Sequence, residues 1–208
     1  DLSGSDNHGT VYGGANFNQS GGFDGFGAVE FDGNDDYVGI IDDSSTSNMS
    51  LDINTSTMMA WIKYDEAAVD GRPIIISKGS SYYLALDSGA GDVWCRYYAD
   101  NAVITNVGSA LSLNKWHHIA CTYDGSNICV YLNGTQAKCE AQTGSVDTND
   151  NDIIIGAQLL EIGGALSNPF NGTIDEIRIY NRSLSQDEIE LIYLNRTNIT
   201  HSNATNPR

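Results

Sequence analysis

The sequence predicts an all-β sandwich with one short helix near its C-terminus. Short apolar runs of strand length recur along the 208 residues, glycine is abundant at 22, and Asp, Asn, Ser and Gly separate the runs. A chain of this length can bury one large core, and all-β sandwiches of this size commonly form a single domain. We therefore expect one domain over residues 1–195. The polar tail over residues 196–208 has too little apolar surface to fold alone.

The predicted strands are runs that are continuously apolar or that alternate with period two. Connections such as Asp124-Gly-Ser-Asn127 and Asn133-Gly134 tolerate positive φ, which is typical of tight turns between antiparallel strands. In chain order the expected strands are Gly27–Phe31, Tyr37–Ile41, Met58–Tyr64, Ile74–Lys78, Tyr82–Leu86, Val93–Tyr98, Val103–Val107, Trp116–Tyr123, Ile128–Asn133, Gln136–Glu140, Ile153–Ile155 and Gly172–Tyr180.

The predicted helix follows the last of these strands. Ser185 can cap it, and Glu188 lies three residues on, where it completes a capping box. Ile189, Ile192 and Tyr193 then mark an apolar stripe at helical spacing. The pattern predicts a helix from about Gln186 to Asn195.

The formal charge of −17, with only 10 Lys plus Arg, leaves no basic patch for phosphates. Nucleic acid and anionic membrane surfaces are therefore poor partners, and cations are better ones. No stretch approaches the roughly 18 to 20 apolar residues that a membrane span needs, so we expect no membrane-spanning helix.

The cysteines are even in number and contain no C-x-x-C pair, which argues against zinc and for two disulfides in an oxidising compartment; they are Cys95, Cys121, Cys129 and Cys139. Their connectivity depends on the turn after Tyr123. A two-residue loop places Cys121 opposite Val130, whereas a three-residue loop places it opposite Cys129. The sequence leaves both alternatives open.

Acceptor triplets for N-linked sugar are more frequent than chance. With 20 Asn and 33 Ser plus Thr, random order gives about three Asn-x-Ser/Thr triplets. Turn chemistry explains part of the excess, but not the three triplets crowded into the last fourteen residues. We expect an N-glycosylated extracellular or cell-surface protein, with candidate sites at Asn18, Asn48, Asn54, Asn133, Asn171, Asn181, Asn195, Asn198 and Asn203.

Several motifs follow one another along the chain. They are Phe31-Asp-Gly-Asn-Asp-Asp-Tyr-Val38, Met59-Ala-Trp-Ile62, Ile76-Ser-Lys-Gly79, Lys115-Trp-His-His-Ile-Ala120, Thr122-Tyr-Asp-Gly125, Val130-Tyr-Leu-Asn-Gly134 and Gly172-Thr-Ile-Asp-Glu-Ile-Arg-Ile-Tyr-Asn-Arg-Ser-Leu-Ser185. In their order and spacing these motifs resemble the laminin-G-like, concanavalin-A-like family over about Leu2 to Leu194. The resemblance implies a two-sheet antiparallel jelly roll. Family members usually begin with a further strand, which this sequence lacks before Val11; a second copy of the chain could donate it across an exposed edge.

The residues do not predict an enzyme. Glycosidases of this fold need two suitably spaced carboxylates, and no Glu-x-Asp-x-(x)-Glu pattern occurs. His117 and His118 are adjacent in a predicted strand, so they point to opposite faces and cannot chelate one ion together. Trp61, in an alternating apolar run, is expected in the core.

Calcium is the expected inorganic partner, as a structural ion, because loops rich in Asp and Asn supply the six to eight oxygens that it takes. The resemblance implies that Asp32, Asp35 and Asp175 hold it. The run Asp147-Thr-Asn-Asp-Asn-Asp152 opens like an EF-hand loop, but Asp152 stands where Gly belongs, so we interpret it as a solvated turn.

Carbohydrate binding needs exposed aromatic rings beside polar groups. Alternation places Trp94 and Tyr98 on one face of a strand and Cys95 and Tyr97 on the other, and it leaves open which pair is buried in the core. The sequence favours a glycosylated structural or adhesive domain, the subunit of a filament assembled by strand exchange. The alternative is a calcium-dependent carbohydrate-binding module of a larger secreted protein.

Overall fold

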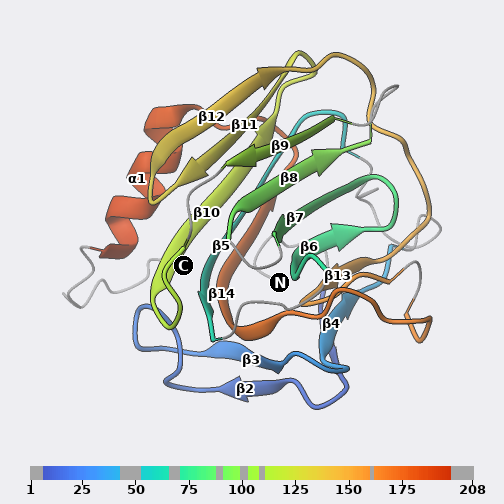
Figure 1. Cartoon of the computed structure of the whole chain (residues 1–208), viewed down its shortest axis with the longest axis vertical. Coiled ribbons are helices and arrows are strands. Elements are labelled where there is room, and N and C mark those ends of the chain that lie inside the picture. The colour runs from blue at the N-terminus through green and yellow to red at the C-terminus, as the bar shows by residue number, and fades with distance from the viewer. Residues whose placement is uncertain are drawn as a thin grey trace, which may run out of the picture.

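The computed structural model is a sandwich of two antiparallel sheets (Figure 1). It describes residues 7–42, 53–65, 71–87, 91–98, 103–107, 111–159 and 162–197. The front sheet has the order β1 (Thr10–Tyr12), β4 (Tyr37–Ile40), β13 (Ile153–Ile155), β6 (Ile74–Lys78), β7 (Tyr82–Leu86), β8 (Val93–Tyr97) and β9 (Val103–Val107). The back sheet has the order β12 (Thr135–Ala141), β11 (Asn127–Leu132), β10 (Trp116–Tyr123), β5 (Ser56–Tyr64), β14 (Asn171–Tyr180), β3 (Ala28–Asp32) and β2 (Asn16–Asn18).

The main core lies between the sheets, and strand alternation decides which side chains enter it. On β8, Cys95 and Tyr97 are fully buried against the back sheet. Trp94 on the same strand and Tyr98 directly after it lie on the opposite, outer face. The Tyr97 hydroxyl bonds to the Ser56 hydroxyl at 2.7 Å, which satisfies its polar group inside the core. The choice that the sequence left open is thereby settled: Trp94 and Tyr98 face outward.

The two disulfides join different parts of the sandwich. Cys121 lies opposite Val130, as a two-residue loop at Gly125–Ser126 requires, so it does not face Cys129. Instead, Cys121 bonds to Cys95 of the facing sheet through the core. Cys129 lies directly opposite Cys139 in the β11–β12 pair and bonds to it. The expectation of two disulfides is confirmed.

The helix α1 (Gln186–Thr197) covers part of the outer face of the back sheet (Figure 1). The predicted capping box is present, because the Ser185 hydroxyl accepts a hydrogen bond from the Glu188 amide at 3.3 Å and the Glu188 carboxylate accepts one from the Ser185 amide at 2.9 Å. Ile189 is fully buried against Met59 and Tyr131. The helix ends two residues later than predicted, and no helix among the described residues is long and apolar enough to cross a membrane.

The structure departs from the sequence-based strands mainly at the N-terminus. Residues 10–12 and 16–18, which we had not assigned to strands, form β1 and β2 and pair with β4 and β3 at one edge of each sheet. Trp61 is buried as expected, but outside the main core: its ring lies on the outer face of the back sheet, stacked on Phe23 and Tyr193.

Candidate functional site

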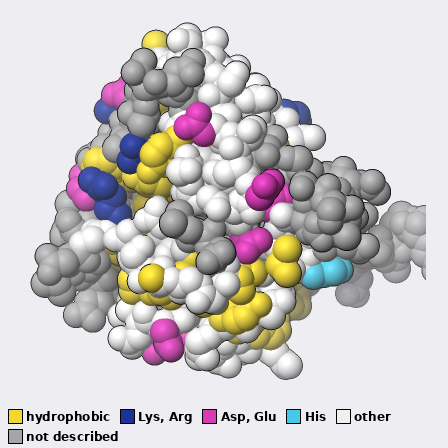
Figure 2. All heavy atoms as spheres, turned by 90° about the vertical axis from the view of Figure 1, so that its right-hand side faces the viewer, with side chains coloured by type: hydrophobic (Ala, Val, Ile, Leu, Met, Phe, Trp, Pro, Cys, Tyr) yellow, Lys and Arg dark blue, Asp and Glu magenta, His cyan; other side chains and the backbone are white. Residues whose placement is uncertain are grey.

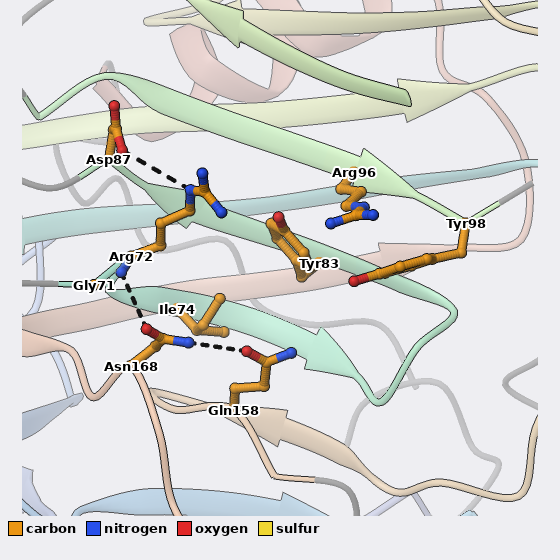
Figure 3. Close-up of a pocket in the computed structure, with 9 residues that line it drawn as sticks. All are labelled: Gly71, Arg72, Ile74, Tyr83, Asp87, Arg96, Tyr98, Gln158 and Asn168. Carbon is orange, nitrogen blue, oxygen red and sulfur yellow. Dashed lines mark hydrogen bonds and ion pairs between the residues drawn. The ribbon is translucent and has the colours of Figure 1, made fainter. Parts of the chain in front are cut away.

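A pocket of about 420 Å³ opens on the outer face of the front sheet (Figure 3). We call it the front-sheet pocket. Residues that are far apart in the sequence line it because β6, β7 and β8 are neighbours in the sheet and the segment before β14 crosses beside them. The lining residues are Gly71, Arg72, Ile74, Tyr83, Asp87, Arg96, Tyr98, Gln158 and Asn168.

Aromatic rings and guanidinium groups pack together at this pocket. The Arg96 guanidinium lies over the Tyr98 ring, 3.9 Å from its centroid, and the Arg72 guanidinium lies 4.1 Å from the centroid of the Trp94 ring. Tyr83 and Tyr98 meet edge to face. Such cation–π contacts hold long arginine side chains in defined positions, so the pocket presents preorganised charges beside apolar surface.

The side-chain amides of Asn168 and Gln158 lie across the pocket from Tyr83 and Tyr98, and we call them the amide wall (Figure 3). Asn168 Oδ1 accepts a hydrogen bond from the Arg72 amide at 3.2 Å, and its Nδ2 donates one to Gln158 Oε1 at 2.9 Å. Gly71 has a φ of 97°, and a Cβ atom there would come within 2.8 Å of Asn168 Oδ1. A glycine is therefore required for the chain to pass this close to the amide wall.

Three N–H groups around the pocket are buried without a hydrogen-bond acceptor among the described residues: Arg72 Nε, Arg96 Nε and Trp94 Nε1. Arg72 Nε lies 3.9 Å from Asp87 Oδ1, which is an ion pair but too long for a hydrogen bond. A buried donor without an acceptor costs about 1–3 kcal/mol.

Basic side chains are scarce on this acidic protein, with 10 Lys plus Arg against 27 Asp plus Glu. On the side viewed in Figure 2, several of them lie close together next to hydrophobic side chains. Among the described residues, two arginines and one aspartate line the front-sheet pocket, so the charge of this described lining is opposite in sign to that of the whole chain. The pocket is thus aromatic, rich in donors and locally positive.

The predicted calcium ligands do not all meet. Asp32, Asp35 and Asp36 form a group whose carboxylates lie within 4.8 Å of one another. Asp175 lies apart from this group: it is positioned further along β14 and accepts hydrogen bonds from the Phe23 and Glu176 amides. Burial raises the pKa of Asp175.

The acidic group also caps its own turn. Asp36 accepts hydrogen bonds from the Gly14 and Asp32 amides, and Asp32 accepts one from Asn34. Hydrogen bonds from the side chain and the backbone amide of Asn34 lower the pKa of Asp32, which keeps this carboxylate ionised. The turn therefore offers carboxylate oxygens, chiefly on the exposed Asp32 and Asp35, to a hard cation.

The histidine pair divides between the two faces of β10, as predicted. His118 is buried between Trp61 and Tyr193, where desolvation lowers its pKa to about 4. His117 lies on the other face, half-buried, with Nε2 3.2 Å from the Ser112 carbonyl. Burial keeps both in the neutral form near pH 7, in agreement with a structural role.

Glu30, a carboxylate on β3, is held by the side-chain amides of β2. Its two carboxylate oxygens accept hydrogen bonds from Asn16 and Asn18, which lower its pKa. A general acid needs the opposite shift.

The candidate glycosylation sites differ in exposure. Asn54 and Asn181 are exposed, whereas Asn18, Asn133 and Asn171 are half-buried. Asn133 occupies the tight β11–β12 turn with a φ of 50°, followed by Gly134 at 79°. The predicted sites Asn48, Asn198 and Asn203, and the side chain of Asn195, lie outside the described residues.

The family model for the concanavalin A-like lectin/glucanases superfamily matches residues 32–190. The chain belongs to this superfamily. The family name covers both lectins and glucanases, so membership alone does not separate binding from hydrolysis. No curated protein sequence matches the chain.

Solved structures confirm the jelly-roll fold. Domain 4 of AbnA, a GH43 extracellular arabinanase from Geobacillus stearothermophilus in complex with arabinotriose, aligns with a TM-score of 0.66 and 18% identity over 88% of this chain and 86% of that one. The binding domain of Paraclostridial Mosquitocidal Protein 1 aligns at 0.71, with 16% identity over 95% and 49% of the two chains. The binding domain of Botulinum Neurotoxin DC in complex with SialylT aligns at 0.72, with 15% identity over 94% and 48%. This chain spans about half the length of the two toxin binding domains.

Sequence reasoning found only part of the front-sheet pocket. It named Trp94 and Tyr98 but missed Arg72, Arg96 and the amide wall. The alternation that grouped Trp94 with Tyr98 also places Arg96 on their face, and this was the available signal. Asn168 and Gln158 carried no comparable signal, because only the fold brings them to β6.

Proposed function

We propose that this domain is a non-enzymatic carbohydrate-recognition domain of a secreted or cell-surface protein, and that it binds sugar in the front-sheet pocket. The observation that carries the proposal is the cluster of Tyr83, Trp94 and Tyr98 on the outer face of the sheet, beside two arginines and the amide wall. Aromatic faces pack against the apolar faces of sugar rings, and fixed donors and acceptors pair with hydroxyl groups.

The similar structures support carbohydrate recognition better than the filament hypothesis that the sequence favoured. The arabinanase domain is described with arabinotriose, and two toxin domains are described as binding domains. The two disulfides and the extracellular arabinanase fit a secreted protein.

A glycan array tests the proposal. The wild-type domain should bind a defined set of glycans, and Tyr98→Ala should lose most of that binding because it removes a ring from the pocket. Phe17→Ala is the matched control, since Phe17 is an exposed aromatic residue on β2 of the other sheet. Absence of wild-type binding, or equal loss in both variants, would refute the proposed site.

Calcium is proposed as a structural ion at Asp32, Asp35 and Asp36. Three carboxylates on one turn support it, and the binding of this ion would stabilise the fold by mass action. Thermal unfolding should shift upward with calcium relative to EGTA, and Asp35→Asn should remove the shift. A wild-type curve that calcium leaves unchanged would contradict this proposal.

N-glycosylation is proposed at the predicted acceptor sites, with Asn54 and Asn181 occupied most fully because they are exposed. The sequon-rich residues 196–208 are proposed to carry sugar outside the folded domain, which we assign to residues 1–195. Peptide mass mapping before and after enzymatic deglycosylation of the secreted protein decides occupancy, and unmodified Asn54 and Asn181 would contradict the assignment.

Assembly by strand exchange stays a prediction from the sequence. Light scattering tests it: a filament subunit gives concentration-dependent polymers, whereas a monomer at all concentrations rejects the hypothesis.

A further inference from the structure

We infer that the front-sheet pocket selects an acidic sugar, one whose ring carries a carboxylate or sulfate ester, and that Arg96 is the residue that binds the anionic group. This inference rests on the proposed function, because it specifies the class of sugar that the same pocket takes.

The first support is the placement of arginine. The chain holds few basic residues for its charge of −17, yet two of them line one pocket. Cation–π attraction alone would hold each arginine over its ring, but it does not require the two charged ends to line one cavity. Arg72 and Arg96 instead lie against Trp94 and Tyr98 with their charged ends at the same cavity (Figure 3).

The second support is that Arg96 lacks an acidic partner among the described residues. Its guanidinium lies 3.9 Å from the centroid of the Tyr98 ring and 6.0 Å from that of the Tyr83 ring. Arg72, by contrast, already has Asp87 at 3.9 Å. A half-buried guanidinium without a counter-ion is the donor that a ligand anion would pair with.

The third support is the size and composition of the cavity. Its 420 Å³ lies toward the lower end of the roughly 300–1,000 Å³ typical of small-molecule sites, which suits a terminal sugar or a short segment. Tyr98, which is partly exposed, offers the ring surface that Arg96 does not cover. Arg96 offers a two-pronged donor for the acid group of the sugar, and Gln158 with Asn168 offer amides for its hydroxyls. A neutral sugar would use the first and third of these features and leave Arg96 unpaired.

The test compares matched acidic and neutral probes by titration calorimetry. The pairs are trigalacturonic acid with its methyl ester, sialyl-lactose with lactose, and 6-sulfo-lactose with lactose; they separate uronic acids, sialic acids and sulfated sugars as sources of the charge. We expect at least one acidic probe to bind about tenfold or more tightly than its neutral counterpart, because charge-assisted hydrogen bonds exceed neutral ones.

Arg96→Gln should weaken binding of the acidic probe much more than binding of the neutral probe, so that the preference is lost. Arg96→Lys should restore part of the preference, since it keeps the charge but loses the planar fork. Lys138→Gln is the control, because it removes the same charge from β12 of the back sheet. Circular dichroism and thermal unfolding verify that each variant is folded, and Arg72→Gln provides a second variant at the pocket.

The outcomes separate the inference from the function on which it rests. If the domain binds neutral glycans on the array and shows no preference for any acidic probe, or if Arg96→Gln keeps the preference, the acidic-sugar inference is wrong and carbohydrate recognition stands. If no glycan binds, the proposed function itself fails.

Discussion

Removal of each disulfide in turn should cost different amounts of stability, and the difference follows from where the bonds lie. Cys95–Cys121 closes a span of 26 residues and joins the two sheets inside the core. Cys129–Cys139 closes a span of 10 residues between neighbouring strands, and Cys139 is exposed. The chain-entropy relation gives losses of about 3.5 kcal/mol for the first bond and about 2.7 kcal/mol for the second.

Packing widens this gap. Cys95 and Cys121 are both fully buried, so their replacement by alanine also leaves unfilled space in the core. Replacing Cys129 and Cys139 leaves little unfilled space in the core, because Cys139 is exposed. Cys95→Ala/Cys121→Ala should therefore lose at least about 1 kcal/mol more than Cys129→Ala/Cys139→Ala.

Urea unfolding at equilibrium, followed by tryptophan fluorescence and far-ultraviolet circular dichroism, measures both losses. The two probes must give one transition for the free energies of unfolding to be compared. An equal or larger loss from the Cys129–Cys139 double variant would refute the reasoning that ranks the bonds by span and burial.

Three further changes test packing and hydrogen bonding elsewhere in the fold. Burial lowers the pKa of His118 to about 4 from an ordinary value of 6.5, so the unfolded state binds more protons than the folded state between these pH values. The free energy of unfolding should therefore fall by up to about 3 kcal/mol as pH drops from 6.5 to 4. His118→Gln should flatten that dependence. Lys78 and Asp42 form a buried ion pair at 2.8 Å, and Lys78→Met should cost about 3–5 kcal/mol by leaving the carboxylate unpaired. Ser185→Ala should cost about 1 kcal/mol through loss of the helix cap, while Ser145→Ala, at an exposed serine outside the cap and outside every acceptor triplet, should cost much less.

A specific result would contradict each of these three predictions. A wild-type pH dependence that His118→Gln leaves unchanged would assign the acid sensitivity to other groups. A Lys78→Met variant as stable as the wild type would show that Asp42 is not confined to the low-dielectric interior. Equal losses for Ser185→Ala and Ser145→Ala would mean that the cap does not hold the helix.

The fold was largely predictable because its signals are local. Ile74–Lys78, Tyr82–Leu86 and Trp116–Tyr123 are continuous apolar or alternating runs, and the structure has strands with these bounds. The capping box at Ser185 needs only residues within one turn of helix. β1 and β2 were missed because each has only three residues, which is too short a run to show the period of a strand.

The site was less predictable because its parts meet only through the fold. Strand alternation grouped Trp94 with Tyr98, but the outward face depends on how the sheets pack. The Cys95–Cys121 bond likewise depends on sheet-to-sheet contact that no spacing encodes. Asp175 was grouped with Asp32 by resemblance, yet the register pairs Asn171, not Asp175, with Asp32, so the carboxylates are separated along the strand.

The most direct test of the central claim is a nuclear magnetic resonance titration of the labelled domain with the tightest-binding glycan from the array. We predict that the largest backbone shifts occur at Tyr83, Arg96 and Tyr98 on the outer face of the front sheet, with smaller shifts at Asn168. Shifts confined to the Asp32–Asp36 turn or to the back sheet would contradict the assignment of the front-sheet pocket as the sugar-binding site.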